Sequence, residues 1–183
     1  MSPNVVSSIR LLLVPGVVVS LLYASEGDLS KWAPVGLFLL AALTDMVDGY
    51  LARHHGKRTL MGAFLDPVAD KALICAPLIV LAVKPIGQRV PVWLVAVVVT
   101  REVFVILGSA ALVLRGAAGR VKPALLGKLS VGVLMVVVLA SLILKEGNPV
   151  FAVLFPVAGV LVVASGLQIL HYGAQVLGEA DER

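Results

Sequence analysis

The sequence predicts an all-α integral membrane protein with six transmembrane helices and a short N-terminal juxtamembrane segment. The 183 residues are 60% hydrophobic and 14% charged, whereas soluble domains contain about 25% charged residues. Six apolar stretches approach the ~20 residues that a helix needs to span a bilayer. The sequence lacks the alternation of apolar and polar residues that a membrane barrel needs. With a mean hydropathy of +1.03, this composition excludes a soluble globular enzyme and a disordered chain.

The apolar stretches follow one another along what we expect to be a single membrane domain, residues 1–183. The first is short for a span unless it begins near Val5. The second and third each carry two Asp residues beside the short loop that joins them, and the fourth has a charged pair in its middle. Turn-forming residues separate the first, third and fifth stretches from the next ones. The expected spans are about 11–24, 32–51, 63–83, 90–114, 127–144 and 150–170.

The Lys and Arg residues predict the orientation, because the cytoplasmic loops of membrane proteins are enriched in them. With the N-terminus inside, nine of the 15 lie on the cytoplasmic side and four outside, while Lys71 and Arg101 fall within spans. Both termini and the loop between the second and third spans are therefore expected in the cytoplasm. If the organism is a bacterium, the membrane is the inner one. The nine are Arg10, Arg53, Lys57, Arg58, Arg115, Arg120, Lys122, Lys128 and Arg183.

Four of the six Asp residues lie close together in the sequence, beside the loop between the second and third spans. Asp45 and Asp48 are three positions apart, so both lie on one face of a helix, and Asp66 and Asp70, four apart, do the same. Converging carboxylates repel one another unless they are partly protonated or share cations. Oxygen ligands favour Mg²⁺, Mn²⁺ or Ca²⁺ over zinc. Four carboxylates suffice for two divalent ions acting on phosphate groups.

The residues around these carboxylates suit a phosphate ligand. Arg53 is a planar donor that matches phosphate oxygens, and Gly49 and Gly62 leave space for a close approach. One Asp alone at a helix end could simply help to end the helix, but two helically phased pairs favour a functional site. The single cysteine, Cys75, excludes a disulfide framework and a Cys-based zinc site.

The motif around this loop resembles the signature of the CDP-alcohol phosphotransferase family at every fixed position. It reads Asp45-x2-Asp48-Gly49-x2-Ala52-Arg53-x8-Gly62-x3-Asp66-x3-Asp70. The resemblance implies a membrane enzyme that transfers a substituted phosphate from a CDP-linked lipid to an alcohol and releases CMP. It also implies a homodimer, and neither the motif nor the resemblance suggests a nucleic-acid partner.

The resemblance further implies a role for each residue of the motif. Two divalent ions, Mg²⁺ or Mn²⁺, are expected on Asp45, Asp48, Asp66 and Asp70. Asp70 is expected to be the general base on the acceptor hydroxyl as well as a metal contact. The residues expected to hold the cytidine diphosphate of CDP-diacylglycerol are Gly49, Ala52, Arg53 and Gly62.

The acceptor is less sharply indicated than the donor. Arg101 and Glu102, in the middle of the fourth span, form either an ion pair that stabilises the helices or a site for an acceptor phosphate. Arg115, Lys122 and Lys128 are either topology charges or part of a basic pocket for an anionic acceptor and lipid head groups.

Two branches of the family offer different acceptors. Residues 62–71, the Arg101-Glu102 pair and Gly127-Lys128 are similar to the phosphatidylglycerophosphate synthases, which use glycerol 3-phosphate. Ser109 departs from that branch, where a second Arg is common. Residues 121–128 and 171–173 look more like the cardiolipin synthases, which use phosphatidylglycerol. We expect glycerol 3-phosphate, by a narrow margin.

A small cation transporter is the alternative from a different functional class. An ion pathway needs polar residues through the whole bilayer. The four carboxylates instead gather near one side, and only Arg101 and Glu102 lie deep in a span. The sequence therefore favours the transferase.

Overall fold

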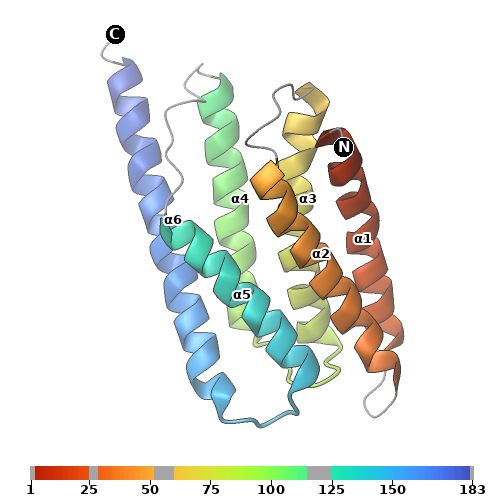
Figure 1. Ribbon diagram of the computed structural model, residues 1–183. Coiled ribbons are helices and arrows are strands. Elements are labelled where there is room, and N and C mark those ends of the chain that lie inside the picture. Colours follow the sequence, from red (N-terminus) through yellow and green to blue (C-terminus); the bar gives the residue numbers. More distant parts are fainter. Residues whose placement is uncertain (1–2, 25–28, 52–59, 115–124, 182–183) are drawn as a thin grey trace. The chain divides into compact units, whose positions relative to one another are not determined.

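A computed structural model of the chain describes residues 3–24, 29–51, 60–114 and 125–181, and the side chains within 13–24, 30–44, 71–108 and 125–173. Over these ranges the chain forms six α-helices, one short 3-10 turn (η1, Leu29–Lys31) and no strand, which confirms the all-α prediction (Figure 1). The helices are α1 (Pro3–Tyr23), α2 (Trp32–Leu51), α3 (Leu60–Val83), α4 (Val92–Leu114), α5 (Leu125–Ile143) and α6 (Val150–Asp181).

The helix bounds agree with the predicted spans except at the two ends of the chain. The segment expected to be juxtamembrane is the first part of α1, which begins at Pro3. Proline is well suited to the first turn of a helix, because its missing N–H needs no partner there. Helix α6 continues past residue 170, the expected end of the last span, to Asp181. The residues after position 170 are more polar than the span, but they include Ala, Gln, Leu and Glu, which favour a helix.

Two helices are long and apolar enough to cross a membrane, judged by length and composition over the described residues. They are α5 and the part of α6 from Val150 to Gly173. Only 33% of each is buried inside the protein, whereas the core helix of a soluble protein is mostly buried. The described parts of α1, α2 and α3 contain shorter apolar stretches. The structure thus confirms six helices, whereas six membrane crossings stay a prediction.

The helices belong to two compact units, each of which is described separately. The first comprises Met1–Val90 and Val138–Asn148. In it α1 packs against both α2 and α3 (Figure 1). Its buried residues come from all three helices and include Val17, Leu21, Phe38, Leu73 and Leu78. Because α2 and α3 run in opposite directions, the end of α2 and the start of α3 lie at the same end of this unit (Figure 1).

The connection between α3 and α4 is held against the end of α5 within the first unit. The Gln88 N–H donates to the carbonyl of Ser141 at 3.0 Å, and the Gly147 N–H donates to Gln88 Oε1 at 2.8 Å. A Cβ on Gly87 would lie 2.6 Å from the carbonyl oxygens of Ser141 and Leu144. Only glycine fits there, since neither carbonyl can move without shifting the backbone.

The second unit comprises Pro91–Val137 and Pro149–Arg183. Within it α4 packs against α6. Gly159 of α6 makes this contact close, because a Cβ there would lie 2.7 Å from Cζ3 of Trp93. Phe151 and Phe155, one helical turn apart on α6, stack with their ring centroids 5.0 Å apart. This unit contains the buried polar residues described below.

Candidate active site and anion site

The four Asp residues of the motif lie on the two helices that the sequence predicted. Asp45 and Asp48 are in the last turns of α2, and Asp66 and Asp70 are in the first half of α3. Since both segments are helical, each pair shares one side of its helix, which is the predicted phasing. The side chains of all four lie outside those that the structure describes.

Two of the other predicted residues of the motif lie in the same part of the first unit. Gly49 is in α2 and Gly62 is in α3. Ala52 and Arg53 are outside the described residues. Their predicted contacts with cytidine diphosphate therefore stay predictions.

The donor set fits a divalent cation by its chemistry. Four carboxylates supply only oxygen ligands, which Mg²⁺ and Mn²⁺ prefer. The two helix ends that carry them lie at one end of the first unit (Figure 1). The side chains that the structure does describe contain no group of three or more His, Cys, Asp or Glu residues that could hold a metal ion.

Arg101 and Glu102 form an ion pair on α4. Nη1 of Arg101 donates to Oε1 of Glu102, and each side chain is only 11% exposed. Adjacent residues on a helix do not normally face each other, so the long Arg101 side chain has to bend towards its neighbour. The pair keeps a permanent charge neutralised inside an apolar unit, where an unpaired charge is strongly unfavourable.

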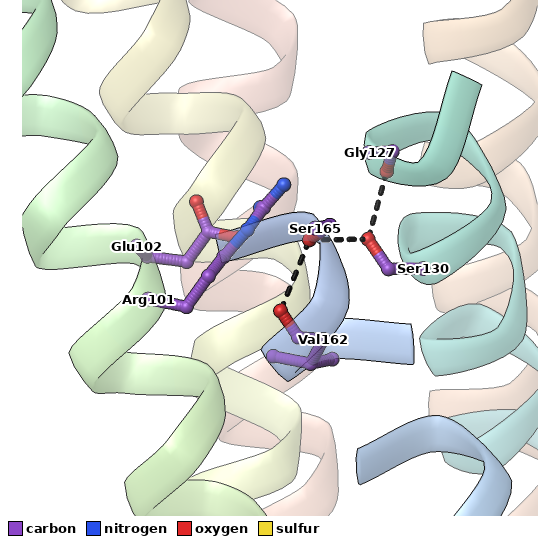
Figure 2. A network of polar contacts seen from close by, with 6 residues as sticks. All are labelled: Arg101, Glu102, Gly127, Ser130, Val162 and Ser165. Carbon is purple, nitrogen blue, oxygen red and sulfur yellow. Dashed lines mark hydrogen bonds and ion pairs between the residues drawn. The ribbon is translucent and has the colours of Figure 1, made fainter. Parts of the chain in front are cut away.

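Two glycines of the other helices border the Arg101 side chain. A Cβ on Gly127 of α5 would lie 3.5 Å from Nη2, and a Cβ on Gly166 of α6 would lie 3.4 Å from Cγ. Figure 2 shows the Arg101 and Glu102 side chains extending from α4 towards α6. Three helices of the second unit therefore meet around the Arg101 side chain.

Two serines join α5 to α6 beside this ion pair, and sequence reasoning missed them. The Ser130 hydroxyl donates to the carbonyl of Gly127 at 2.9 Å and lies 3.4 Å from the Ser165 hydroxyl. The Ser165 hydroxyl donates to the carbonyl of Val162 at 3.1 Å (Figure 2). The sequence does contain a pattern that could have predicted this contact. Each of the two apolar helices has a small polar residue, and such residues are typical of close helix contacts in membranes.

Among the described side chains of this unit, two buried polar atoms have no hydrogen-bond partner. They are Nε of Arg101 and Oε1 of Gln168. The other predicted acceptor residues are less defined: Lys128 is exposed on α5, and Arg115 and Lys122 lie outside the described residues. Of the predicted acceptor residues whose side chains are described, Arg101 is therefore the one in a buried polar setting.

Comparison with known proteins identifies the family. A family model described as CDP-alcohol phosphatidyltransferase matches residues 1–166. The chain belongs to this family. The resemblance carried by the Asp motif is thereby confirmed, and the match extends well beyond the motif to the Arg101–Glu102 pair and to Ser130 and Ser165.

Several named proteins are similar to this CDP-alcohol phosphatidyltransferase family member. A Bacillus subtilis protein named CDP-diacylglycerol--glycerol-3-phosphate 3-phosphatidyltransferase is 35% identical over 166 residues, which cover 85% of this chain and 82% of that protein. A Cereibacter sphaeroides protein of the same name is 41% identical over 106 residues, 56% of this chain and 46% of that protein. A cardiolipin synthase (CMP-forming) of Oryza sativa subsp. japonica is 45% identical over 84 residues, 46% of this chain and 25% of that protein. The chain thus spans about half the length of the Cereibacter relative and a quarter of the rice relative.

Proposed function

We propose that this protein transfers the phosphatidyl group of CDP-diacylglycerol to glycerol 3-phosphate and releases CMP. The observation that carries the proposal is the complete Asp motif, with Asp45 and Asp48 in the last turns of α2 and Asp66 and Asp70 in the first half of α3, in a chain of this family. The names of the Bacillus and Cereibacter relatives support the donor and the acceptor.

In this proposal the four carboxylates hold two Mg²⁺ or Mn²⁺ ions, with Asp45, Asp48 and Asp66 as ligands and Asp70 as a further contact. When bound, such ions clamp a diphosphate and neutralise charge on the leaving group. Arg53 donates to the diphosphate, and Gly49, Ala52 and Gly62 leave room for the nucleotide.

Asp70 acts as the general base. Its carboxylate accepts the proton of the acceptor hydroxyl, whose oxygen attacks the phosphorus that carries diacylglycerol. The bond from that phosphorus to the bridging oxygen breaks, and CMP leaves. The acceptor phosphate is bound by Arg101, and Arg115, Lys122 and Lys128 supply further positive charge.

We also propose the membrane arrangement. The chain crosses the membrane six times with both termini and the active site in the cytoplasm, and it acts as a homodimer among membrane lipids. The excess of Lys and Arg in the segments assigned to the inside supports this orientation. Family membership supports a transferase over the alternative of a small cation transporter.

Phosphatidylglycerol is the second candidate acceptor, which would make the protein a cardiolipin synthase. The rice relative favours it, as does the likeness of residues 121–128 to that branch. Both candidates share the donor, the metal ions and the base, and differ only in the molecule that supplies the hydroxyl.

The test is transfer from labelled CDP-diacylglycerol by the purified protein in liposomes. Glycerol 3-phosphate, phosphatidylglycerol and other alcohols are offered separately, with and without a chelator. We expect phosphatidylglycerophosphate and CMP, abolished by chelation and restored by Mg²⁺ or Mn²⁺. Product from phosphatidylglycerol alone would overturn the acceptor, and activity that survives the chelator would overturn the metal ions.

A further inference from the structure

Three basic residues gather at the end of the first unit that lies away from the Asp motif. Lys84 directly follows α3, Arg89 lies in the connection from α3 to α4, and Lys145 follows α5. Gln88 bonds both to the end of α5 and to the turn after it, so the two connections lie together. Lys84 is 14 positions after Asp70, so about 21 Å of helix separates this end from the motif. We call Lys84, Arg89 and Lys145 the basic cluster.

The basic cluster has little negative charge of the protein beside it. All three side chains are exposed, and none forms an ion pair with a carboxylate among the described side chains. The Lys84 ammonium donates to the carbonyl of Leu22 at the end of α1, which uses one of its three N–H bonds. Residues 84–90 contain no acidic residue, and residues 144–149 contain only Glu146. The cluster therefore has donors left for an anion.

Helix ends and membrane topology do not account for Arg89. Lys84 and Lys145 follow the C-terminal ends of α3 and α5, where the helix dipole favours a positive charge. Arg89 instead precedes α4, which begins at Val92, and the start of a helix gives a positive charge no such support. In the proposed topology this end faces away from the cytoplasm, and loops on that side usually contain few Lys and Arg. An anion from outside the chain would supply the missing negative charge.

The position of the basic cluster along the helices indicates a lipid head group as this anion. Helix α5 has 19 residues and is apolar enough to cross a membrane, and its length of about 28 Å is close to the ~30 Å of the hydrocarbon layer. Its last residue, Ile143, is exposed, as is Val83 at the end of α3. Lys84 and Lys145 come within two positions of these apolar residues, which places them at the level of the phosphates. A soluble anion would make no use of the apolar side chains.

We propose that the basic cluster binds the phosphate of an anionic phospholipid, with Arg89 as the main donor and the acyl chains along Val83 and Ile143. Arg89 has a planar pair of N–H donors that fits two phosphate oxygens, and Lys84 and Lys145 add positive charge. The leaflet, which is the outer one, rests on the topology in the proposed function, whereas the cluster rests on the structure. This lipid contact is separate from the transfer reaction at the Asp motif.

The test is the binding of single lipid molecules to the purified protein in detergent, measured by native mass spectrometry. Phosphatidylserine is the anionic probe, because it is neither the donor nor a candidate acceptor of the proposed reaction, and phosphatidylcholine is the zwitterionic comparison. We expect Arg89→Gln to weaken phosphatidylserine binding about fivefold. Its phosphatidylcholine binding and its melting temperature without lipid should stay at the wild-type values, since the Arg89 side chain is exposed. Unchanged phosphatidylserine binding by Arg89→Gln overturns the proposal.

Lys31→Gln is the matched control, because it removes one positive charge from the same end of the first unit. Lys31 directly precedes α2, but its Nζ lies 5.3 Å from the centre of the Trp32 ring and it is outside the basic cluster. We expect Lys31→Gln to bind phosphatidylserine as the wild type does. Equal weakening by Lys31→Gln and Arg89→Gln would show a diffuse attraction between charges, and that result overturns the cluster.

Inorganic phosphate tests whether the site takes a lipid or a free anion. We expect an excess of phosphate to leave phosphatidylserine bound, because phosphate lacks acyl chains to contact Val83 and Ile143. Complete displacement by phosphate would overturn the assignment to a lipid.

The transfer assay distinguishes failure of this inference from failure of the proposed function. If the protein transfers nothing from CDP-diacylglycerol but binds phosphatidylserine through Arg89, the proposed function fails and the lipid surface stands. If Arg89→Gln binds phosphatidylserine as the wild type does, the lipid surface fails whatever the activity.

Discussion

Carboxylate side chains are few in this apolar chain, and each one calls for a physical explanation. An ionised side chain within a membrane span is costly and is retained where it binds or reacts. In the proposed function, Asp45, Asp48, Asp66 and Asp70 have such a reason, as metal ligands and general base. The Glu102 carboxylate has a different one, since it neutralises and holds Arg101.

At Asp70 we predict a loss of chemistry without a loss of binding. Asp70→Asn keeps the size of the side chain but cannot accept a proton, so kcat should fall about 100-fold to 10,000-fold. Binding of CDP-diacylglycerol in the presence of Mg²⁺, measured with labelled lipid, should stay near the wild-type value. Glu146→Gln is the control, because Glu146 is exposed in the turn between α5 and α6. Full turnover by Asp70→Asn would rule out this base.

At the scale of the helices, close contacts depend on small residues. Gly159 admits the Trp93 ring between α4 and α6, and Gly87 admits two carbonyl groups at the end of α5. Ser130 and Ser165 add a polar link between α5 and α6. In lipid, where burial of apolar surface gives helices little reason to associate, such packing and hydrogen bonds hold them together.

Gly87→Ala should destabilise the first unit by about 1–3 kcal/mol, because its Cβ would overlap two backbone carbonyls. The measurement is unfolding in detergent by heat or denaturant. Gly36→Ala is the matched control within α2, where a Cβ meets nothing within 4 Å. It should be neutral or stabilising by up to about 1 kcal/mol. Equal stability of the two variants would show that the connection does not pack as described.

The Ser130–Ser165 link should contribute at most about 0.6 kcal/mol, a typical value for a hydrogen bond between helices in a membrane, because the one Ser130 hydroxyl proton is shared between Ser165 and the Gly127 carbonyl. A double-mutant cycle of Ser130→Ala and Ser165→Ala isolates this coupling from the separate bonds to Gly127 and Val162. If the two effects on unfolding free energy simply add, the hydroxyls do not interact.

At the scale of the whole molecule, the described side chains expose many large apolar groups, as is typical of a membrane protein. Large apolar side chains are exposed along α6, such as Val153, Val160 and Leu167. Trp32 and Trp93 are about half exposed near helix starts, and Lys31 Nζ lies 5.3 Å from the centre of the Trp32 ring. Aromatic and basic residues in such places are typical of the membrane–water interface.

The orientation can be tested with single cysteines in a Cys75→Ala background. Lys145 and Lys128 are both exposed, and the proposed topology puts them on opposite sides of the membrane. An impermeant thiol reagent should label Lys145→Cys in intact cells, but Lys128→Cys only after permeabilisation. The reverse pattern would contradict the cytoplasmic active site.

The sequence by itself determined the features that depend on which residues are neighbours along the chain. Six helices, most of their ends, the phasing of the Asp pairs and the family all follow from apolar stretches, turn residues and fixed spacing. Helix α1 begins before the expected first span and α6 continues beyond the expected last one, because apolar length predicts a membrane span and not the full length of a helix. A helix needs suitable backbone and side-chain propensities and can continue into water.

Only the tertiary structure decided what depends on contacts between distant residues. The sequence left Arg101 and Glu102 open between an ion pair and an acceptor site. The structure shows the pair and, beside it, a buried Nε of Arg101 without a partner among the described residues. Gly127 and Gly166, more than 20 positions along the chain from Arg101, became meaningful only when their helices were packed around it. Spacing predicts which residues share a helix face, but the packing of separate helices decides which faces meet.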